Sequence, residues 1–171
     1  ARRVRELGVY SEIYPWDIAP EKISSLRPKG VILSGGPESV TQENTPRIPE
    51  IIFDLNIPIL GICYGMQTLA EQNGGSVTTS SKKEFGYAEL KIERSSKIFN
   101  GLDAENLDVW MSHGDHVSIL PNGFILSAST ESAPIAAMEH NDKPYYALQF
   151  HPEVTHTNKG QKIIENFIAD I

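Results

Sequence analysis

The single cysteine of the chain stands where a strand pattern gives way to a helical one, in the run Gly61-Ile62-Cys63-Tyr64-Gly65. A short apolar run over residues 57–62 reads as a strand, and apolar residues then recur at helical spacing as far as Gly74-Gly75. Backbone N–H groups at the start of a helix favour a thiolate, the nucleophilic form of cysteine. The flanking glycines allow a sharp bend and the approach of a substrate carbonyl. The pattern predicts a nucleophile elbow. The alternative, a buried core cysteine, would not need these glycines.

A base and its partner come near the other end of the chain, in the run Gln149-Phe150-His151-Pro152-Glu153. A thiolate nucleophile needs a histidine, and the histidine needs a group that fixes its tautomer and orientation. His151 and Glu153 supply both residue types, and the rigid φ of Pro152 sets how the two side chains diverge. Taken alone, the histidine could be an ordinary surface or core residue. The elbow in the same chain favours catalysis.

Two backbone N–H groups are candidates for an oxyanion hole, which would stabilise the charge that acyl transfer builds on a carbonyl oxygen. One belongs to Tyr64, directly after the nucleophile. The other belongs to Gly36, in the run Leu33-Ser34-Gly35-Gly36-Pro37 after an apolar strand. The alternative for this run is an ordinary glycine-proline turn.

Composition excludes several other classes of protein. The chain has 171 residues and a net charge of −7, and its 15 basic residues are scattered, so no nucleic-acid surface is expected. A single cysteine excludes an internal disulfide and suits a reducing cytoplasm. We find no apolar run long enough for a bilayer and no signal-peptide pattern.

Metal and nucleotide sites are not expected in this chain. His113, Asp115, His116 and His156 lack the spacing of common zinc helices, and no second cysteine exists. The Gly35-Gly36 pair lacks the Lys-Ser/Thr continuation of a phosphate loop.

The first half of the chain alternates strands and helices, which predicts a parallel sheet with helices on both faces and ligand groups at the carboxyl ends of its strands. The expected elements are a helix over 1–7 ended by Gly8, a strand over 9–14, a helix over 20–26, a buried strand over 30–33 and a helix over 46–55.

After Gly75 closely spaced strands with short turns predict hairpins. They are expected at 77–79, 87–92, 107–111, 117–120, 124–129, 135–139 and 145–150. An amphipathic helix over 158–171 closes the chain, with its inward face formed by Ile163, Ile164, Phe167, Ile168 and Ile171. The predicted fold is α/β, flavodoxin-like and three-layered, with a mostly parallel central sheet and additional antiparallel strands in the C-terminal half.

Four runs together resemble class I (triad-type) glutamine amidotransferase domains: Gly61-Ile62-Cys63-Tyr64-Gly65-Met66-Gln67, Leu33-Ser34-Gly35-Gly36-Pro37, Met111-Ser112-His113-Gly114-Asp115 and Gln149-Phe150-His151-Pro152-Glu153-Val154. The tyrosine after the cysteine, the Ser-His-Gly-Asp run and the extended segment 151–157 are most similar to the GMP synthase branch of this family. The resemblance covers residues 1–171 as one domain. Two departures from the family pattern are a first strand absent before Ala1 and an ATP pyrophosphatase (synthetase) domain absent after Ile171.

The resemblance implies a glutaminase half-reaction. Cys63 would attack the glutamine side-chain amide, His151 would protonate the leaving ammonia and activate water, and Glu153 would hold the imidazole. Gly36 and Tyr64 would form the oxyanion hole. The resemblance also implies substrate contacts from Gln67 and from a loop made by Ser112, His113, Gly114 and Asp115.

The partners implied by the resemblance lie outside this domain. Ammonia would pass to adenylylated XMP held by a synthetase domain or subunit, giving GMP. That domain would bind ATP and Mg²⁺, whereas this one would need no cofactor. The complete enzyme would be a cytoplasmic homodimer.

Other functions stay open at this point. The chain could donate ammonia to a different acceptor, or it could be a cysteine hydrolase of similar fold that cleaves γ-glutamyl or peptide bonds. A catalytically silent or redox-sensing module is a further possibility. Intact Cys63, His151 and Glu153 argue against silence, and the lack of a resolving cysteine argues against redox sensing.

Overall fold

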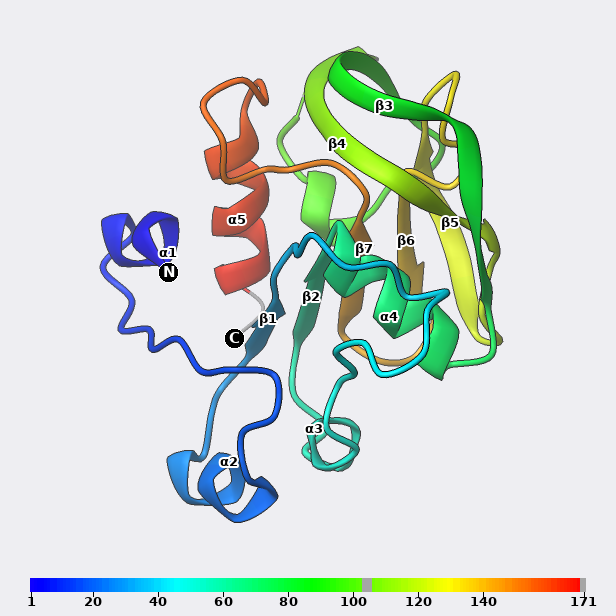
Figure 1. Ribbon diagram of the computed structural model, residues 1–171. Helices are drawn as coiled ribbons and strands as arrows, with labels where there is room; N and C mark the ends of the chain where they lie inside the picture. The colour runs from blue at the N-terminus through cyan, green and yellow to red at the C-terminus, as the bar shows by residue number, and fades with distance from the viewer. Residues whose placement is uncertain (103–105, 170–171) are drawn as a thin grey trace.

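A mixed β-sheet runs through the computed structural model, which describes residues 1–102 and 106–169 (Figure 1). Within that part of the chain the sheet has seven strands, in the order β1-β2-β7-β6-β5-β3-β4. The strands are β1 (Val31–Leu33), β2 (Ile59–Ile62), β3 (Ser76–Ile92), β4 (Asn106–Ile119), β5 (Phe124–Ser129), β6 (Ala137–His140) and β7 (Tyr145–Leu148). The helices are α1 (Arg2–Glu6), α2 (Pro20–Leu26), α3 (Ile51–Asp54), α4 (Tyr64–Gln72) and α5 (Gly160–Ala169), with a 3₁₀ turn, η1, at Lys97–Phe99.

Parallel pairing is confined to three strands. β2 lies parallel to β1 on one side and to β7 on the other, whereas β3, β4, β5 and β6 join through antiparallel pairs. The expectation of a mostly parallel sheet is therefore wrong. A parallel neighbour needs a long crossover, usually a helix, whereas β5 and β6 are joined only by residues 130–136 and β6 and β7 only by residues 141–144, so these strands pair antiparallel.

Two apolar cores lie on opposite faces of the parallel strands. Successive side chains of a strand point to opposite faces. Leu60 of β2 accordingly packs in the cluster that contains Phe167 of α5, and Ile59 packs in the cluster that contains Met66 and Leu69 of α4. The sheet thus has a helix against each face in this region, and the α/β prediction is confirmed.

The C-terminal helix buries the face that the sequence predicts. Ile163, Ile164 and Phe167 are buried, and Ile168 packs against the same cluster while remaining partly exposed. Ile171 lies outside the described residues. A fully buried Phe or Ile contributes about 2 kcal/mol through the hydrophobic effect, so this helix depends on its contact with the sheet.

Strands β3 and β4 form one long curved hairpin at the top of Figure 1. The sequence predicts four shorter strands here, with the Ser-His-Gly-Asp run as a loop between two of them. The prediction of a loop is wrong, because residues 112–115 lie inside β4. Ser112 pairs with Phe85, His113 with Glu84 and Asp115 with Thr79 across the hairpin. Pairing with β3 continues through the polar run, apart from a register shift on the β3 side between Thr79 and Glu84.

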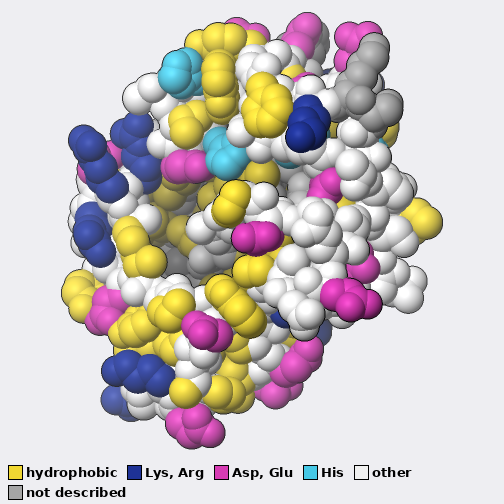
Figure 2. Space-filling model, in the orientation of Figure 1, with side chains coloured by type: hydrophobic (Ala, Val, Ile, Leu, Met, Phe, Trp, Pro, Cys, Tyr) yellow, Lys and Arg dark blue, Asp and Glu magenta, His cyan; other side chains and the backbone are white. Residues whose placement is uncertain are grey.

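The strand expected over residues 9–14 does not form. The segment is irregular, and its side chains are exposed: Tyr10 by 82% and Ile13 by 78%. Figure 2 shows hydrophobic side chains gathered on this lower left part of the molecule. Alternation alone does not make a strand, because its backbone groups need a paired neighbour.

Other helices and strands lie closer to their predicted bounds. α2 and β5 have the predicted limits, whereas α3 is shorter than the helix expected over 46–55. β1 is less buried than expected, since it lies at the edge of the sheet and Ile32 is 36% exposed. None of the helices in the described part of the chain combines the length and the apolar character needed to cross a membrane.

The packing of α4 against β1 generates a stability prediction. In an exposed helix, Gly→Ala stabilises by about 1 kcal/mol. Gly65→Ala is expected instead to lower the free energy of unfolding by about 3 kcal/mol, because its Cβ would lie 2.1 Å from the carbonyl oxygen of Leu33. Urea denaturation measures the change. Gly114→Ala is the matched control, since its nearest contact would be an ordinary 3.6 Å. Equal stability of the two variants would contradict the prediction.

Candidate active site

Cys63 occupies a sharp turn between β2 and α4. Its backbone has φ 53° and ψ −110°, a conformation that non-glycine residues rarely adopt. The strand side of the turn is fixed by a 2.7 Å hydrogen bond from the Cys63 N–H to the carbonyl of Leu148 in β7. The helix side is fixed by the bond from the Gln67 N–H to the Cys63 carbonyl. This is the strand-to-helix elbow that the sequence predicts, and the cysteine at its tip is only 5% exposed.

The two glycines beside the elbow allow close packing. A Cβ on Gly65 would collide with the Leu33 carbonyl of β1, and a Cβ on Gly61 would lie 2.8 Å from the Gly65 carbonyl. The positive φ falls on Cys63 itself. The close approach of Gly61 and Gly65 agrees with the sharp bend that the sequence predicts, whereas room for a substrate carbonyl stays a prediction.

His151 and Glu153 form an ion pair on the loop that follows β7. Nδ1 of His151 lies 2.7 Å from Oε1 of Glu153. The loop is held by a hydrogen bond from the His151 N–H to the Trp110 carbonyl and by one from Arg3 Nε to the Glu153 carbonyl. A Cβ on Gly160 would lie 2.1 Å from the Pro152 carbonyl, so the start of α5 packs directly beneath the loop.

The histidine ring lies beside the Cys63 sulfur. The pKa of His151 is raised to about 10, first by hydrogen bonding toward Cys63 and next by the hydrogen bond to Glu153, while burial opposes both. Among the described residues, Nε2 is buried and has no partner of ordinary hydrogen-bond distance and angle, whereas Nδ1 has its bond to Glu153. Attraction by two acidic neighbours still favours the protonated ring. An imidazolium next to sulfur is the arrangement that favours a thiolate.

The glycine pair after β1 lies over these two side chains. A Cβ built on Gly35 would be 3.2 Å from Cε1 of His151 and 3.5 Å from Cβ of Cys63. One built on Gly36 would be 3.9 Å from Cγ of Tyr64. Tyr64 is the first residue of α4, and the first N–H groups of a helix have no partner inside it. The structure thus brings both predicted oxyanion donors to the elbow.

Comparison with known proteins identifies the family of this arrangement. Residues 1–171 match the family described as glutamine amidotransferase class-I. The chain belongs to the class I glutamine amidotransferases. It is 58% identical over 179 residues to a GMP synthase [glutamine-hydrolyzing] of Hahella chejuensis and 53% identical over 171 residues to one of Aliivibrio fischeri. Each alignment covers 100% of this chain but only 34% and 33% of the relative, so the chain spans about a third of their length.

A solved structure shows the same amidotransferase fold. A Thermoplasma acidophilum protein described as a GMP synthase subunit superposes with a TM-score of 0.84 at 39% identity, over 98% of this chain and 84% of that one. The agreement extends beyond the sequence motifs to the arrangement of the whole chain.

The Ser-His-Gly-Asp run of this amidotransferase reaches the elbow from β4. The Ser112 carbonyl lies 3.5 Å from Sγ of Cys63 and can accept its S–H. His113 is buried between the Asp115 carbonyl on Nδ1 and the Glu84 carboxylate on Nε2, each at 3.0 Å. Burial lowers the pKa of His113, against the opposing attraction of Glu84. Gly114 lies between His113 and Asp115 in the strand, and a Cβ added to it would be at an ordinary distance of 3.6 Å from Lys83.

Gln67 connects the Ser112–Asp115 run of β4 to the end of β7. Its Nε2 donates to the Asp115 carbonyl at 2.8 Å and to Oε1 of Gln149 at 3.3 Å. The residue is 3% exposed. In this structure the Gln67 amide therefore ties α4 to β4 and to the end of β7, so its donors are already used.

Three residues of the site were not singled out from the sequence. Ser39 donates a hydrogen bond to the Asp115 carboxylate, Arg47 binds the hydroxyl of Tyr64, and Glu84 pairs with His113. Each is an isolated polar residue far from its partner in the sequence. No local pattern marks such residues, because only the fold brings the partners together.

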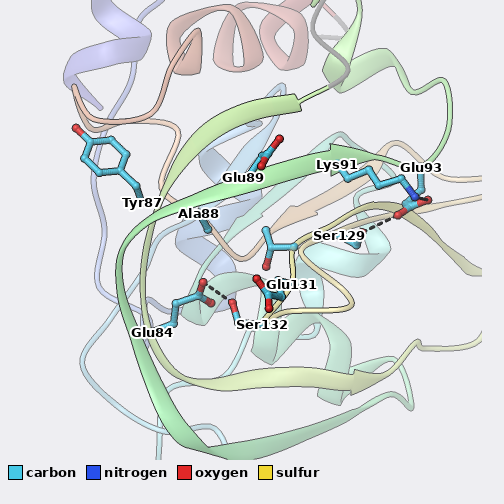
Figure 3. A pocket seen from close by; sticks show the side chains of 10 residues that line it. Glu84, Tyr87, Ala88, Glu89, Lys91, Glu93, Ser129, Glu131 and Ser132 are labelled. Atoms are coloured by element: carbon cyan, nitrogen blue, oxygen red, sulfur yellow. Dashed lines mark hydrogen bonds and ion pairs between the residues drawn. The ribbon is translucent and has the colours of Figure 1, made fainter.

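A separate hollow of about 610 Å³ lies between β3 and residues 129–132 (Figure 3). None of the predicted site residues lines it. Its lining is rich in carboxylates, and Glu84 there bonds Ser132 on one oxygen and His113 on the other. Across the described residues, no three His, Cys, Asp or Glu side chains gather closely enough to hold a metal ion. The candidate active site is instead the elbow at Cys63 with the His151 loop and the glycine pair around it.

The raised pKa of His151 gives a titration prediction. Cys63→Ala removes its largest cause and Glu153→Gln the next, so each substitution is expected to lower the pKa of His151. Because the folded pKa is above the usual 6.5, the associated stabilisation is complete below about pH 6.5 and disappears as pH rises through about 10. NMR of the imidazole nitrogens against pH measures the shift. His140, remote from the elbow, is the internal control. An unchanged His151 titration in Cys63→Ala would refute the contact.

Proposed function

We propose that this chain hydrolyses the side-chain amide of glutamine through a thioester on Cys63. The observation that carries the proposal is the placement of one imidazole between sulfur and carboxylate. His151 lies beside Cys63 and is bound by Glu153 at 2.7 Å, although the three come from two distant parts of the chain. Membership of the class I glutamine amidotransferases supports the same reaction.

The proposed chemistry proceeds in two steps that use the same histidine. The thiolate attacks the amide carbon, and the negative charge that develops on its oxygen is stabilised by the N–H groups of Gly36 and Tyr64. His151 then gives its proton to the nitrogen, which leaves as ammonia. Water, deprotonated by His151, attacks the thioester and releases glutamate with the thiolate restored. Glu153 keeps the ring oriented throughout.

We propose that the residues around Cys63 bind the substrate. The run Ser112–Asp115 presents backbone groups beside the sulfur, and His113 and Asp115 hold that backbone through their own hydrogen bonds. Gln67 fixes the Asp115 carbonyl. We propose that glutamine lies between this part of β4 and the glycine pair, with Gly114 leaving room for its α-amino and α-carboxylate groups.

We further propose that the ammonia serves the conversion of XMP to GMP, as the names of the relatives suggest for those proteins. The acceptor would be adenylylated XMP on a synthetase domain or subunit, which would bind ATP and Mg²⁺. The glycine pair of this chain does not fit a nucleotide phosphate. The pair is followed by an irregular segment before α3, and not by the helix that a phosphate loop leads into.

Three finer points also remain proposals. The helices α4 and α5 on opposite faces of β2 support a flavodoxin-like three-layer arrangement of the parallel part. A cytoplasmic location is proposed from the single unpaired cysteine. A homodimer is proposed for the complete enzyme by resemblance to its family.

The nucleophile is tested by Cys63→Ala. Ammonia release from glutamine is expected to fall by at least about 10⁴-fold, because no covalent intermediate can form, while glutamine affinity changes little. A coupled glutamate dehydrogenase assay measures ammonia, and calorimetry measures binding. Release of amines from γ-glutamyl peptides is measured in parallel. Turnover retained by the variant would disprove the assignment, and faster cleavage of the peptides than of glutamine would favour a γ-glutamyl hydrolase.

Coupling to an acceptor is tested by comparing the chain alone with the chain together with its synthetase domain or subunit. Uncontrolled hydrolysis would waste glutamine, so the chain alone is expected to be the weaker glutaminase, and XMP with ATP and Mg²⁺ is expected to stimulate only the combined form. Ammonia release at saturating glutamine measures both. Full activity of the isolated chain would contradict the coupling.

A further inference from the structure

The loop between β1 and α3, residues 34–50, holds one of the two proposed oxyanion donors. Gly35 and Gly36 at its start have no side chains through which the fold could fix them. Both are exposed, and the following residues form only turns and bends. An oxyanion hole nevertheless requires a donor held at about 3 Å from a developing charge. The position of Gly36 must therefore be fixed by contacts elsewhere along the loop.

Arg47 forms hydrogen bonds with several groups at the far end of this loop. Its Nη2 donates to the Val40 carbonyl at 2.8 Å. Its Nη1 donates to Oγ1 of Thr45 at 2.7 Å and to the Pro46 carbonyl at 3.1 Å. The same nitrogen lies 3.3 Å from the hydroxyl of Tyr64. A guanidinium can bind several acceptors at once in a fixed plane, so Arg47 joins the loop to the first residue of α4.

The side chain of Tyr64 spans the distance from that arginine back to the glycine pair. Its hydroxyl donates to the Pro46 carbonyl at 2.7 Å, and the residue is only 6% exposed. At the other end of the side chain, a Cβ built on Gly36 would be 3.9 Å from Cγ and 4.0 Å from Cβ of Tyr64. The Tyr64 side chain thus lies on the side of Gly36 from which a side chain would project.

We infer that the Tyr64 side chain, held by Arg47 and the Pro46 carbonyl, is a positioning residue that sets the Gly36 N–H relative to the Tyr64 N–H. The inference rests on the proposed glutaminase function. One residue then contributes to the oxyanion hole twice: its backbone supplies one donor, and its ring and hydroxyl hold the loop that supplies the other. Ser39, nearer the start of the same loop, donates a hydrogen bond to the Asp115 carboxylate.

Tyr64→Phe tests the hydroxyl without removing the ring. In the chain together with its synthetase domain or subunit, we expect kcat for glutamine hydrolysis to fall about ten- to a hundredfold, with KM changed less than about twofold, because the donor loop is misplaced in the transition state. Tyr145→Phe is the matched control. Tyr145 is also buried and donates to a backbone carbonyl, that of Phe53, but away from the elbow, so kcat should remain at the wild-type value.

Two compounds that react with the Cys63 thiol distinguish a misplaced oxyanion donor from a general loss of active-site structure. Glutamate γ-semialdehyde adds to the thiol and forms an oxyanion, so its affinity for Tyr64→Phe should fall in proportion to kcat. Iodoacetamide alkylates the thiolate without forming an oxyanion, so its rate should equal that of the wild type. An unchanged kcat in Tyr64→Phe, or an alkylation rate that falls as much as kcat, would overturn the inference.

Arg47→Lys completes the test. Lysine keeps the charge but cannot bind the Val40 carbonyl and the Tyr64 hydroxyl together, so a similar loss of kcat is expected. If both residues act through one contact, the double variant should lose no more than about twofold beyond the worse single variant. Fully additive losses would overturn the inference. If the wild type itself releases no ammonia from glutamine, the proposed function fails, which is a different outcome from an unaffected variant.

Discussion

The close packing of α4 on β1 and β2 is the constraint on which the site depends. The helix approaches the strands so nearly that neither Gly61 nor Gly65 could carry a side chain. The chain has only one residue, Cys63, in which to turn from strand to helix, and that residue takes a positive φ at a cost of about 1–3 kcal/mol. Burial of the α4 residues from Tyr64 to Ala70 offsets this cost. The backbone strain and the position of Cys63 at the tip of the elbow have the same origin.

Parallel strands bring the other groups to the same edge. β1, β2 and β7 run in one direction, so the residues after their carboxyl ends meet: the glycine pair, Cys63 and the His151 loop. The glycine pair closes over sulfur and imidazole from β1, and the start of α5 supports Pro152 from below. The segments that follow β1, β2 and β7 at this edge are each attached to a strand whose position the sheet determines.

The antiparallel half of the sheet also takes part in the site. β4 places the Ser112 carbonyl at the sulfur, and the Asp115 carboxylate receives a hydrogen bond from the loop after β1. Gln67 then connects the Asp115 carbonyl with Gln149 in the interior. Buried polar groups of this kind are costly unless they are paired, so a network that spans α4, β4 and β7 favours one relative placement of these elements.

Local patterns in the amino-acid sequence were enough to predict the candidate residues and the elements next to them. Cys63 at a strand-to-helix turn, His151 with Glu153 two residues later, and the amphipathic face of α5 all follow from spacing and residue type. Features that depend on neighbours far along the chain could be seen only in the folded protein. Residues 9–14 alternate like a strand but find no partner, and the Ser112–Asp115 run is drawn into β4 by pairing with β3. The contacts of Arg47 with Tyr64 and of Glu84 with His113 likewise join residues that no local pattern relates. Hydrogen bonds and close packing between distant segments are set by the fold, and only the fold could show them.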